Sequence, residues 1–229
     1  MPGAPAVDSL AGSTPGGGGS AQTWTHTTGS GPDGLLLVCA AASSALLPSS
    51  VTYGGAALTH LQSAESGSGS TDRDVDTWYM LAPPPGAASV TCTYATTTAG
   101  ISAESVTFTG VSQSSPFGST GTFASTSAGT AATVTTSPAS ALLLSFICAR
   151  ATTAPSPGSG ETSQWALLGG TNIYGAGATQ PGGAGVTSQF TFSPADHCAM
   201  ITIPLLGAQA ASAASNVVAA LVASGATGL

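Results

Sequence analysis

Short stretches in which apolar and polar residues alternate recur along most of the chain. The segments 103–111, 186–193 and 198–206 show this period most clearly. Alternation with a period of two is typical of antiparallel strands that turn one face to a core. The predicted strands, separated by Gly, Pro and Ser, are 22–29, 35–42, 51–58, 74–82, 88–96, 103–111, 131–137, 141–150, 163–169, 186–193 and 198–206. No long amphipathic helix competes with them, so the pattern predicts an all-β sandwich.

Two runs, Leu35–Val38 and Leu142–Leu144, are apolar without alternation, and the segments around them resemble each other. Leu36–Cys39 matches the run from Leu143 to Cys148, and Pro85–Thr91 resembles Pro181–Thr187. A continuously apolar strand is typical of one covered on both faces, so both runs are predicted to lie centrally. Two similar sets of strands predict a double Greek key, that is, a jelly-roll-like antiparallel β-sandwich of about ten strands. Chance similarity in a chain rich in Thr, Gly and Ala remains the alternative.

Composition divides the chain into three parts. Residues 1–20 include the run Gly16–Gly19 and predict a flexible N-terminal arm. Residues 21–207 form the predicted sandwich. Residues 208–229 are rich in Ala and other small residues, and either a helix or a frayed tail fits them.

Charge is scarce, which excludes several classes of function. Charged residues make up 5% of the chain, the net charge is −7, lysine is absent, and Arg73 and Arg150 are the two arginines. Nucleic-acid binding and P-loop chemistry are therefore not expected. The segment Met1–Leu10 has neither a basic nor an apolar signal region, and Asn216–Leu229 is too short to span a bilayer. We expect no signal peptide and no membrane insertion.

Candidate chemical sites are few. Cys39, Cys92, Cys148 and Cys198 are widely spaced, and we interpret them as buried free thiols, although three disulfide pairings are compatible with four cysteines. Asp72, Asp74 and Asp76 alternate as in a calcium loop, but Thr77 and Pro83 replace the Gly and Glu that an EF-hand requires, which favours a solvated loop. The sequence has neither an H-E-x-x-H nor a G-x-S-x-G motif. No catalytic residue and no cofactor is predicted, with calcium the only candidate ion.

Five motifs carry a family resemblance. They are Thr23–Thr27, Val51–Thr59, Trp78–Gly86, Val90–Tyr94 and Ser105–Val111, and with the later strands the resemblance extends from residue 22 to about 206. In order and spacing the chain resembles β-sandwich modules of tailed-phage minor tail proteins, particularly of actinobacterial phages. The resemblance implies a non-catalytic virion protein, either a minor tail or tail-tip component or a capsid decoration protein, and it assigns no functional residues.

A virion role implies particular partners and a location. The expected partners are other virion proteins, further copies of this chain and host-surface glycans, and the expected location is the virion surface after synthesis in the host cytoplasm. The alternative is a secreted or surface carbohydrate-binding module, which predicts exposed aromatic side chains and calcium bound by Asp72, Asp74 and Asp76. A hydrolase assembled from distant residues ranks last.

Overall fold

The computed structural model describes residues 4–13, 19–43, 47–67, 72–98, 100–136, 142–170, 173–183 and 185–208. Every helix or strand assigned in these ranges is a β-strand, so the all-β prediction is confirmed. The strands are β1 (Ala6–Gly12), β2 (Gly19–Thr28), β3 (Leu35–Ser43), β4 (Ser50–Tyr53), β5 (Ala56–Ala57), β6 (Thr59–Glu65), β7 (Arg73–Leu81), β8 (Gly86–Thr98), β9 (Ser102–Thr109), β10 (Gly121–Thr136), β11 (Leu142–Arg150), β12 (Ser156–Pro157), β13 (Thr162–Gly169), β14 (Ile173–Pro181) and β15 (Val186–Leu205).

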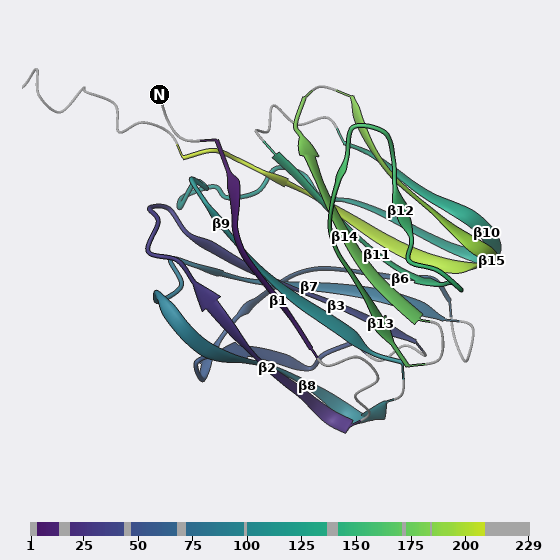
Figure 1. Ribbon diagram of the computed structural model, residues 1–229, viewed down its shortest axis with the longest axis horizontal. Helices are drawn as coiled ribbons and strands as arrows, with labels where there is room; N and C mark the ends of the chain where they lie inside the picture. Colours follow the sequence, from purple (N-terminus) through teal and green to yellow (C-terminus); the bar gives the residue numbers. More distant parts are fainter. Residues whose placement is uncertain are drawn as a thin grey trace, which may run out of the picture.

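These strands form three antiparallel sheets. The first sheet has the order β1-β9-β3-β7-β6, and the second has the order β10-β15-β11-β14-β13, with β12 also paired to β15. The third sheet, β2-β8-β4-β5, lies at the lower left in Figure 1, and the second-sheet strands lie at the upper right. The three packed sheets make a β-sandwich. The jelly-roll arrangement itself is not confirmed.

The two halves of the chain repeat one topology. In the first half, the first strand, β1, pairs with the last strand, β9, and β9 pairs with the central apolar strand β3. In the second half, β10 pairs in the same way with β15, and β15 pairs with the central apolar strand β11. Leu35 pairs with Phe108 and Leu81, just as Leu142 pairs with Leu205 and Pro181. The outer half of β10 pairs with the start of β15 as β2 pairs with β8. The similarity of the two apolar runs therefore reflects equivalent places in a repeated fold.

Three clusters of buried side chains separate the layers. The largest lies between the first and second sheets and includes Leu37 of β3 and Phe146 of β11. A second cluster, including Val38 and Tyr53, lies between the first and third sheets. A third cluster lies within the second half of the chain and includes Ile147 of β11 and Phe190 of β15. Because β3 and β11 are covered on both faces, the runs Leu35–Val38 and Leu142–Leu144 within them are continuously apolar, as predicted.

Several predicted boundaries need correction. The flexible arm is wrong for Ala6–Gly12, which is strand β1 and pairs with β9 from Ala6↔Thr109 to Gly12↔Glu104. Strands β6 and β14 were not predicted, and 186–193 and 198–206 belong to one long strand, β15. Strands β6 and β14 are stabilised by backbone hydrogen bonds to neighbouring strands although their side chains alternate poorly. The Gly-rich residues 14–18 and the tail from 209 to 229 lie outside the described residues.

Candidate functional site

The three acidic residues proposed as calcium ligands are all buried. Asp72 precedes β7, and Asp74 and Asp76 lie on it; the exposed fraction of each is at most 1%. The prediction of a solvated loop is therefore wrong. Within the ranges that the structure describes, no group of three His, Cys, Asp or Glu residues is arranged to hold a metal ion.

Asp76 binds two side chains rather than an ion. Its carboxylate accepts hydrogen bonds from His60 Nε2 and Trp78 Nε1, both at 2.6 Å. The His60 and Trp78 rings meet edge to face, with centroids 5.1 Å apart. Burial raises the pKa of Asp76, and the two hydrogen bonds oppose this rise. Of the three side chains, His60 is the most exposed, with its side chain 46% exposed. The hydrogen bond between His60 and Asp76 links β6 to β7.

Arg73 connects the two halves of the chain. Only 2% of this residue is exposed, and its Nη2 donates to Asp196 Oδ2 at 2.7 Å. Its Nη1 donates to the Asp72 carbonyl oxygen at 2.6 Å. A buried guanidinium needs such partners because desolvation of an unpaired charge is costly. Nothing in the local sequence around Arg73 indicates a partner 123 residues away.

His26 lies at the centre of a buried network. Ser105 Oγ donates to the Ala11 carbonyl oxygen and accepts from Trp24 Nε1, both at 2.9 Å. Its single proton is thus used, so His26 Nδ1 donates to Ser105 Oγ at 2.9 Å, and Nε2 accepts from Thr107 Oγ1 at 2.6 Å. Burial lowers the pKa of His26, partly offset by the charge of Asp8.

This network resembles a nucleophile–base pair but is enclosed. Ser9 Oγ also lies 3.1 Å from His26 Nε2, so a hydroxyl and an imidazole are within hydrogen-bonding distance. His26 itself is fully buried. Thr107 borders a small cavity of about 190 Å³ between the loops 29–34 and 82–85, and neither Ser9 nor His26 lines it. The network joins β1, β2 and β9, and its clearest effect is to hold the first and third sheets together.

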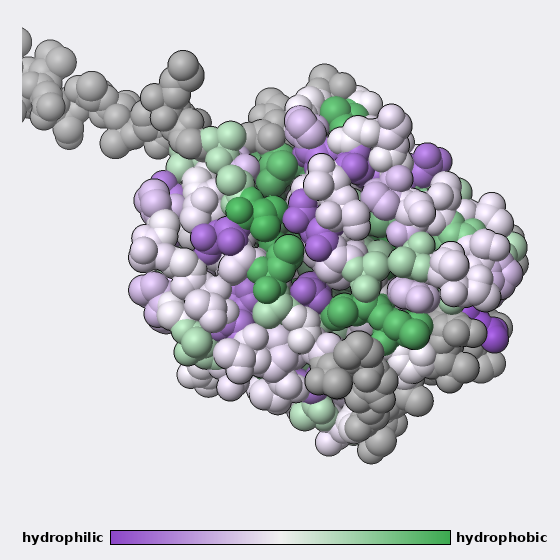
Figure 2. All heavy atoms as spheres, in the orientation of Figure 1, coloured by the Kyte–Doolittle hydropathy of each residue, from purple (hydrophilic) through white to green (hydrophobic). Residues whose placement is uncertain are grey.

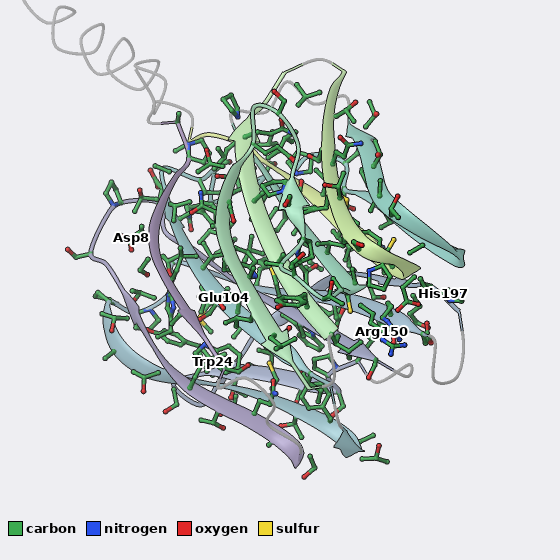
Figure 3. All side chains as sticks on the ribbon, turned by 45° about the vertical axis from the view of Figure 1, so that its right-hand side comes forward. Asp8, Trp24, Glu104, Arg150 and His197 are labelled. Atoms are coloured by element: carbon green, nitrogen blue, oxygen red, sulfur yellow. The ribbon has the colours of Figure 1, made fainter. Side chains whose placement is uncertain are left out.

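Glu104 is a buried carboxyl group between the first and second sheets. Burial raises its pKa to about 8, and Oε2 has no hydrogen-bond partner in the described structure. A Cβ at Gly12 would overlap this oxygen and the Leu167 side chain. Figure 3 shows Glu104 in the middle of the molecule. The group is therefore protonated near pH 7, and glycine at position 12 leaves room for it.

The cysteines and aromatic residues mostly belong to the core. All four thiols are free and buried, as predicted. Cys148 and Cys198 lie on the neighbouring strands β11 and β15 but in different clusters, and Cys39 and Cys92 lie in different sheets and in different clusters. Trp24, Trp165, Tyr53 and Tyr94 are buried as well. A sugar-binding platform would have to use other side chains.

The second half carries an open groove at one end. A cavity of about 460 Å³ lies between Thr130 and Ala131 of β10, the segment 153–156 and residues 191–193 of β15. A second cavity, of about 280 Å³, is lined by the preceding residues 150–152 and the following residues 194–196 of the same two segments. The Thr152 N–H donates to the Ser193 carbonyl oxygen at 2.8 Å and joins the two walls. We call residues 150–156 and 191–196, with Thr130 and Ala131, the terminal groove.

Comparison of the chain with protein-family models, curated proteins and solved structures finds no match. The described part of the chain also contains no helix capable of crossing a membrane.

Proposed function

We propose that the chain is a non-catalytic structural protein of a phage virion, exposed on the particle as a minor tail or tail-tip component or as a capsid decoration. The observation that carries this proposal is the outward face of the sandwich. Thr23, Thr25 and Thr27 are exposed on β2 and alternate with buried residues. On the other half, Thr133 and Thr135 of β10 occupy the equivalent exposed positions.

Hydroxyl side chains form hydrogen-bonded pairs across these outer strands. Thr23 Oγ1 lies 3.1 Å from Thr91 Oγ1 in the first half, and Thr135 Oγ1 lies 2.8 Å from Thr187 Oγ1 in the second. Figure 2 accordingly shows a face that is mostly pale, with green patches over β1 and β13, the strands that carry the exposed Leu10 and Leu168. Such an uncharged surface of hydroxyl-bearing strands suits a protein that must persist outside a cell while it is packed among copies of itself.

The low content of basic residues supports the same proposal. Arg73 is buried and Arg150 is exposed, so the folded chain offers trypsin-like proteases one accessible arginine. A protein displayed on a released particle meets such proteases, and resistance to them preserves the particle. The sequence resemblance to tail modules points in the same direction.

Quantitative mass spectrometry of density-purified phage particles that encode this chain tests the proposal. A ratio near one copy per major capsid protein supports a decoration protein, and a few copies per particle support a tail component. Absence of the chain from the particles overturns the virion proposal. The terminal groove would then favour the second candidate, a carbohydrate-binding surface module.

A further inference from the structure

We propose that the terminal groove is a binding site for an acidic saccharide, with Arg150 holding a carboxylate of the sugar. This inference goes beyond the virion proposal and does not depend on it, because the groove belongs to the folded chain wherever that chain acts. It rests on the lining of the groove, on the distribution of charge and on the comparison of the two halves.

The larger part of the groove is lined by hydroxyl groups. Thr130, Thr153, Ser156, Thr191 and Ser193 all lie along it and are exposed. Its apolar lining is limited to Ala131, Ala154 and Phe192, and Phe192 is 6% exposed within the third core cluster. A peptide requires apolar pockets for alternate side chains, whereas hydroxyl groups in a shallow groove match the hydroxyls of a sugar. The lining therefore favours a saccharide over a peptide.

The smaller part of the groove supplies one positive and one negative group. Arg150 is exposed and lines it, and the other arginine, Arg73, is buried behind it in the ion pair with Asp196. Figure 3 shows Arg150 and His197 close together at one end of the molecule, far from Asp8 and Trp24. A guanidinium binds a carboxylate through two parallel hydrogen bonds. In a chain with a net charge of −7, this side chain is the one exposed arginine available to an anion.

Asp196 adds a carboxylate to the lining of the groove, and its negative charge is already paired with Arg73. Its Oδ2 accepts from Arg73 and its Oδ1 accepts from the backbone N–H of His197 at 2.9 Å, so both oxygens are held in place. A carboxylate that is already paired has lone pairs left for the hydroxyl protons of a ligand. The groove therefore matches an acidic sugar. Arg150 would bind the carboxylate of the sugar, and Asp196 and the Ser and Thr residues would bind its hydroxyl groups.

The repeated topology allows the residues at this end of the second half to be compared with the described residues at the equivalent place in the first half. Ser43 at the end of β3 occupies the place of Arg150 at the end of β11. Beside Ser43 the chain turns at Gly100, where an added Cβ would lie 2.8 Å from Ser43 Oγ and 3.3 Å from Ile173 Cγ1 of the second half. Among the described residues, Ser43 of the first half and Ile173 of β14 therefore lie close together at this end. In the second half it faces solvent and carries an arginine.

Titration of the full-length chain, followed by amide NMR shifts, tests the site with three probes. These are a uronic-acid tetrasaccharide, its carboxyl-reduced neutral counterpart and a tetraglutamate peptide. We expect the uronic-acid tetrasaccharide to shift amides of residues 150–156 and 191–196. The neutral counterpart should bind about tenfold more weakly, because it lacks the charge-assisted pair.

Three variants locate the binding. Arg150→Gln should weaken the uronic-acid tetrasaccharide about tenfold and leave the neutral one unchanged, and Thr153→Val should weaken both. Thr25→Val, an exposed threonine of β2 at a distance from the groove, is the matched control and should change neither. The amide spectrum of each variant shows directly whether it is folded.

Three results overturn the proposal. The first is that the uronic-acid and neutral tetrasaccharides bind equally well and that Arg150→Gln changes neither affinity. Such a result would show that the carboxylate of the sugar is not recognised. The second is a groove shifted by tetraglutamate and by neither saccharide, which makes the ligand a peptide. The third is no shift in the groove with any probe at millimolar concentration.

Discussion

The most unusual individual residues are ionisable side chains buried away from water. Glu104, Arg73 and Asp74 are each at most 5% exposed, in a chain with 5% charged residues. Burial is costly for a charge, so each group must be neutralised or paired. Glu104 is neutralised through its raised pKa, and Arg73 is paired with Asp196. These two solutions predict different responses to substitution.

Glu104 should make the protein less stable as the pH rises. Its pKa is about 8 in the folded protein and 4.5 in an unfolded chain, so its contribution is complete below pH 4.5 and is lost as the pH rises through 8. Glu104→Gln keeps the neutral shape and should raise the free energy of unfolding at pH 9 by about 2–4 kcal/mol, with little change at pH 4. Urea unfolding at pH 4, 7 and 9 measures this.

The matched control for Glu104 is Glu65→Gln, which changes an exposed residue of β6. It should leave the pH dependence of the wild type unchanged. An equal pH dependence in wild type and Glu104→Gln would show that Glu104 is ionised in the folded protein and would contradict the prediction.

Removal of Asp196 should be costly because it leaves the Arg73 guanidinium buried without this partner. We expect Asp196→Ala to lower the free energy of unfolding by about 3–5 kcal/mol. The double variant Arg73→Met, Asp196→Ala should recover part of this loss, since the buried charge is then gone. Denaturant unfolding of the three proteins gives the values. A single variant within about 0.5 kcal/mol of wild type would mean that water or other groups replace Asp196.

At the scale of the elements, close packing determines which residues certain strands must contain. Strand β14 contains Gly175 and Gly177 between β11 and β13, and Trp165 of β13 lies over Gly177. Glycine and alanine are poor strand formers when considered locally. This composition explains why alternation did not predict β14, although its backbone is paired on both sides.

A methyl group at Gly177 should disrupt the packing of β13 on β14. Its Cβ would overlap the Trp165 indole, so Gly177→Ala should lower the free energy of unfolding by about 1–3 kcal/mol. Gly34→Ala, whose Cβ would lie 3.4 Å from Pro83 Cδ, is the control and should remain within about 0.5 kcal/mol of wild type. Tryptophan fluorescence during thermal unfolding reports both. Equal stability of the two variants would contradict the packing argument.

At the scale of the whole molecule, the two halves share one core. Side chains of β3, β7 and β9 meet those of β11, β13 and β15 in the largest buried cluster. The segment between the halves is fastened to both, since Val111 N donates to the Asp33 carbonyl oxygen at 3.0 Å and Ser112 N donates to that of Leu206 at 2.9 Å. The repeats are therefore not independent units, and access to Arg73 requires opening of the shared interface.

Limited proteolysis measures this closure. The folded chain should be cut by trypsin after Arg150 alone, because Arg73 is buried between the halves. The urea-unfolded chain should be cut after both arginines, which serves as the control. Intact-mass analysis of the digests distinguishes the fragments. Cleavage of the folded chain after Arg73 would show that the interface opens readily and would contradict the prediction.

The sequence by itself determined the fold class, the two central strands and the burial of the cysteines. These follow from local patterns, because alternation and unbroken apolar runs depend only on which faces of a strand are covered. Leu35–Val38 and Leu142–Leu144 are therefore central in the structure as predicted.

Only the tertiary structure decided which distant segments meet. The pairing of β1 with β9, the ion pair of Arg73 with Asp196, the raised pKa of Glu104 and the terminal groove all depend on contacts between residues far apart in the chain. Asp72, Asp74 and Asp76 resemble an exposed calcium loop in sequence, but strand β7 is covered on both faces, by the second half through Val75 and by the third sheet through Trp78. Burial by a remote segment leaves no local periodicity, so no pattern around these residues could have predicted it.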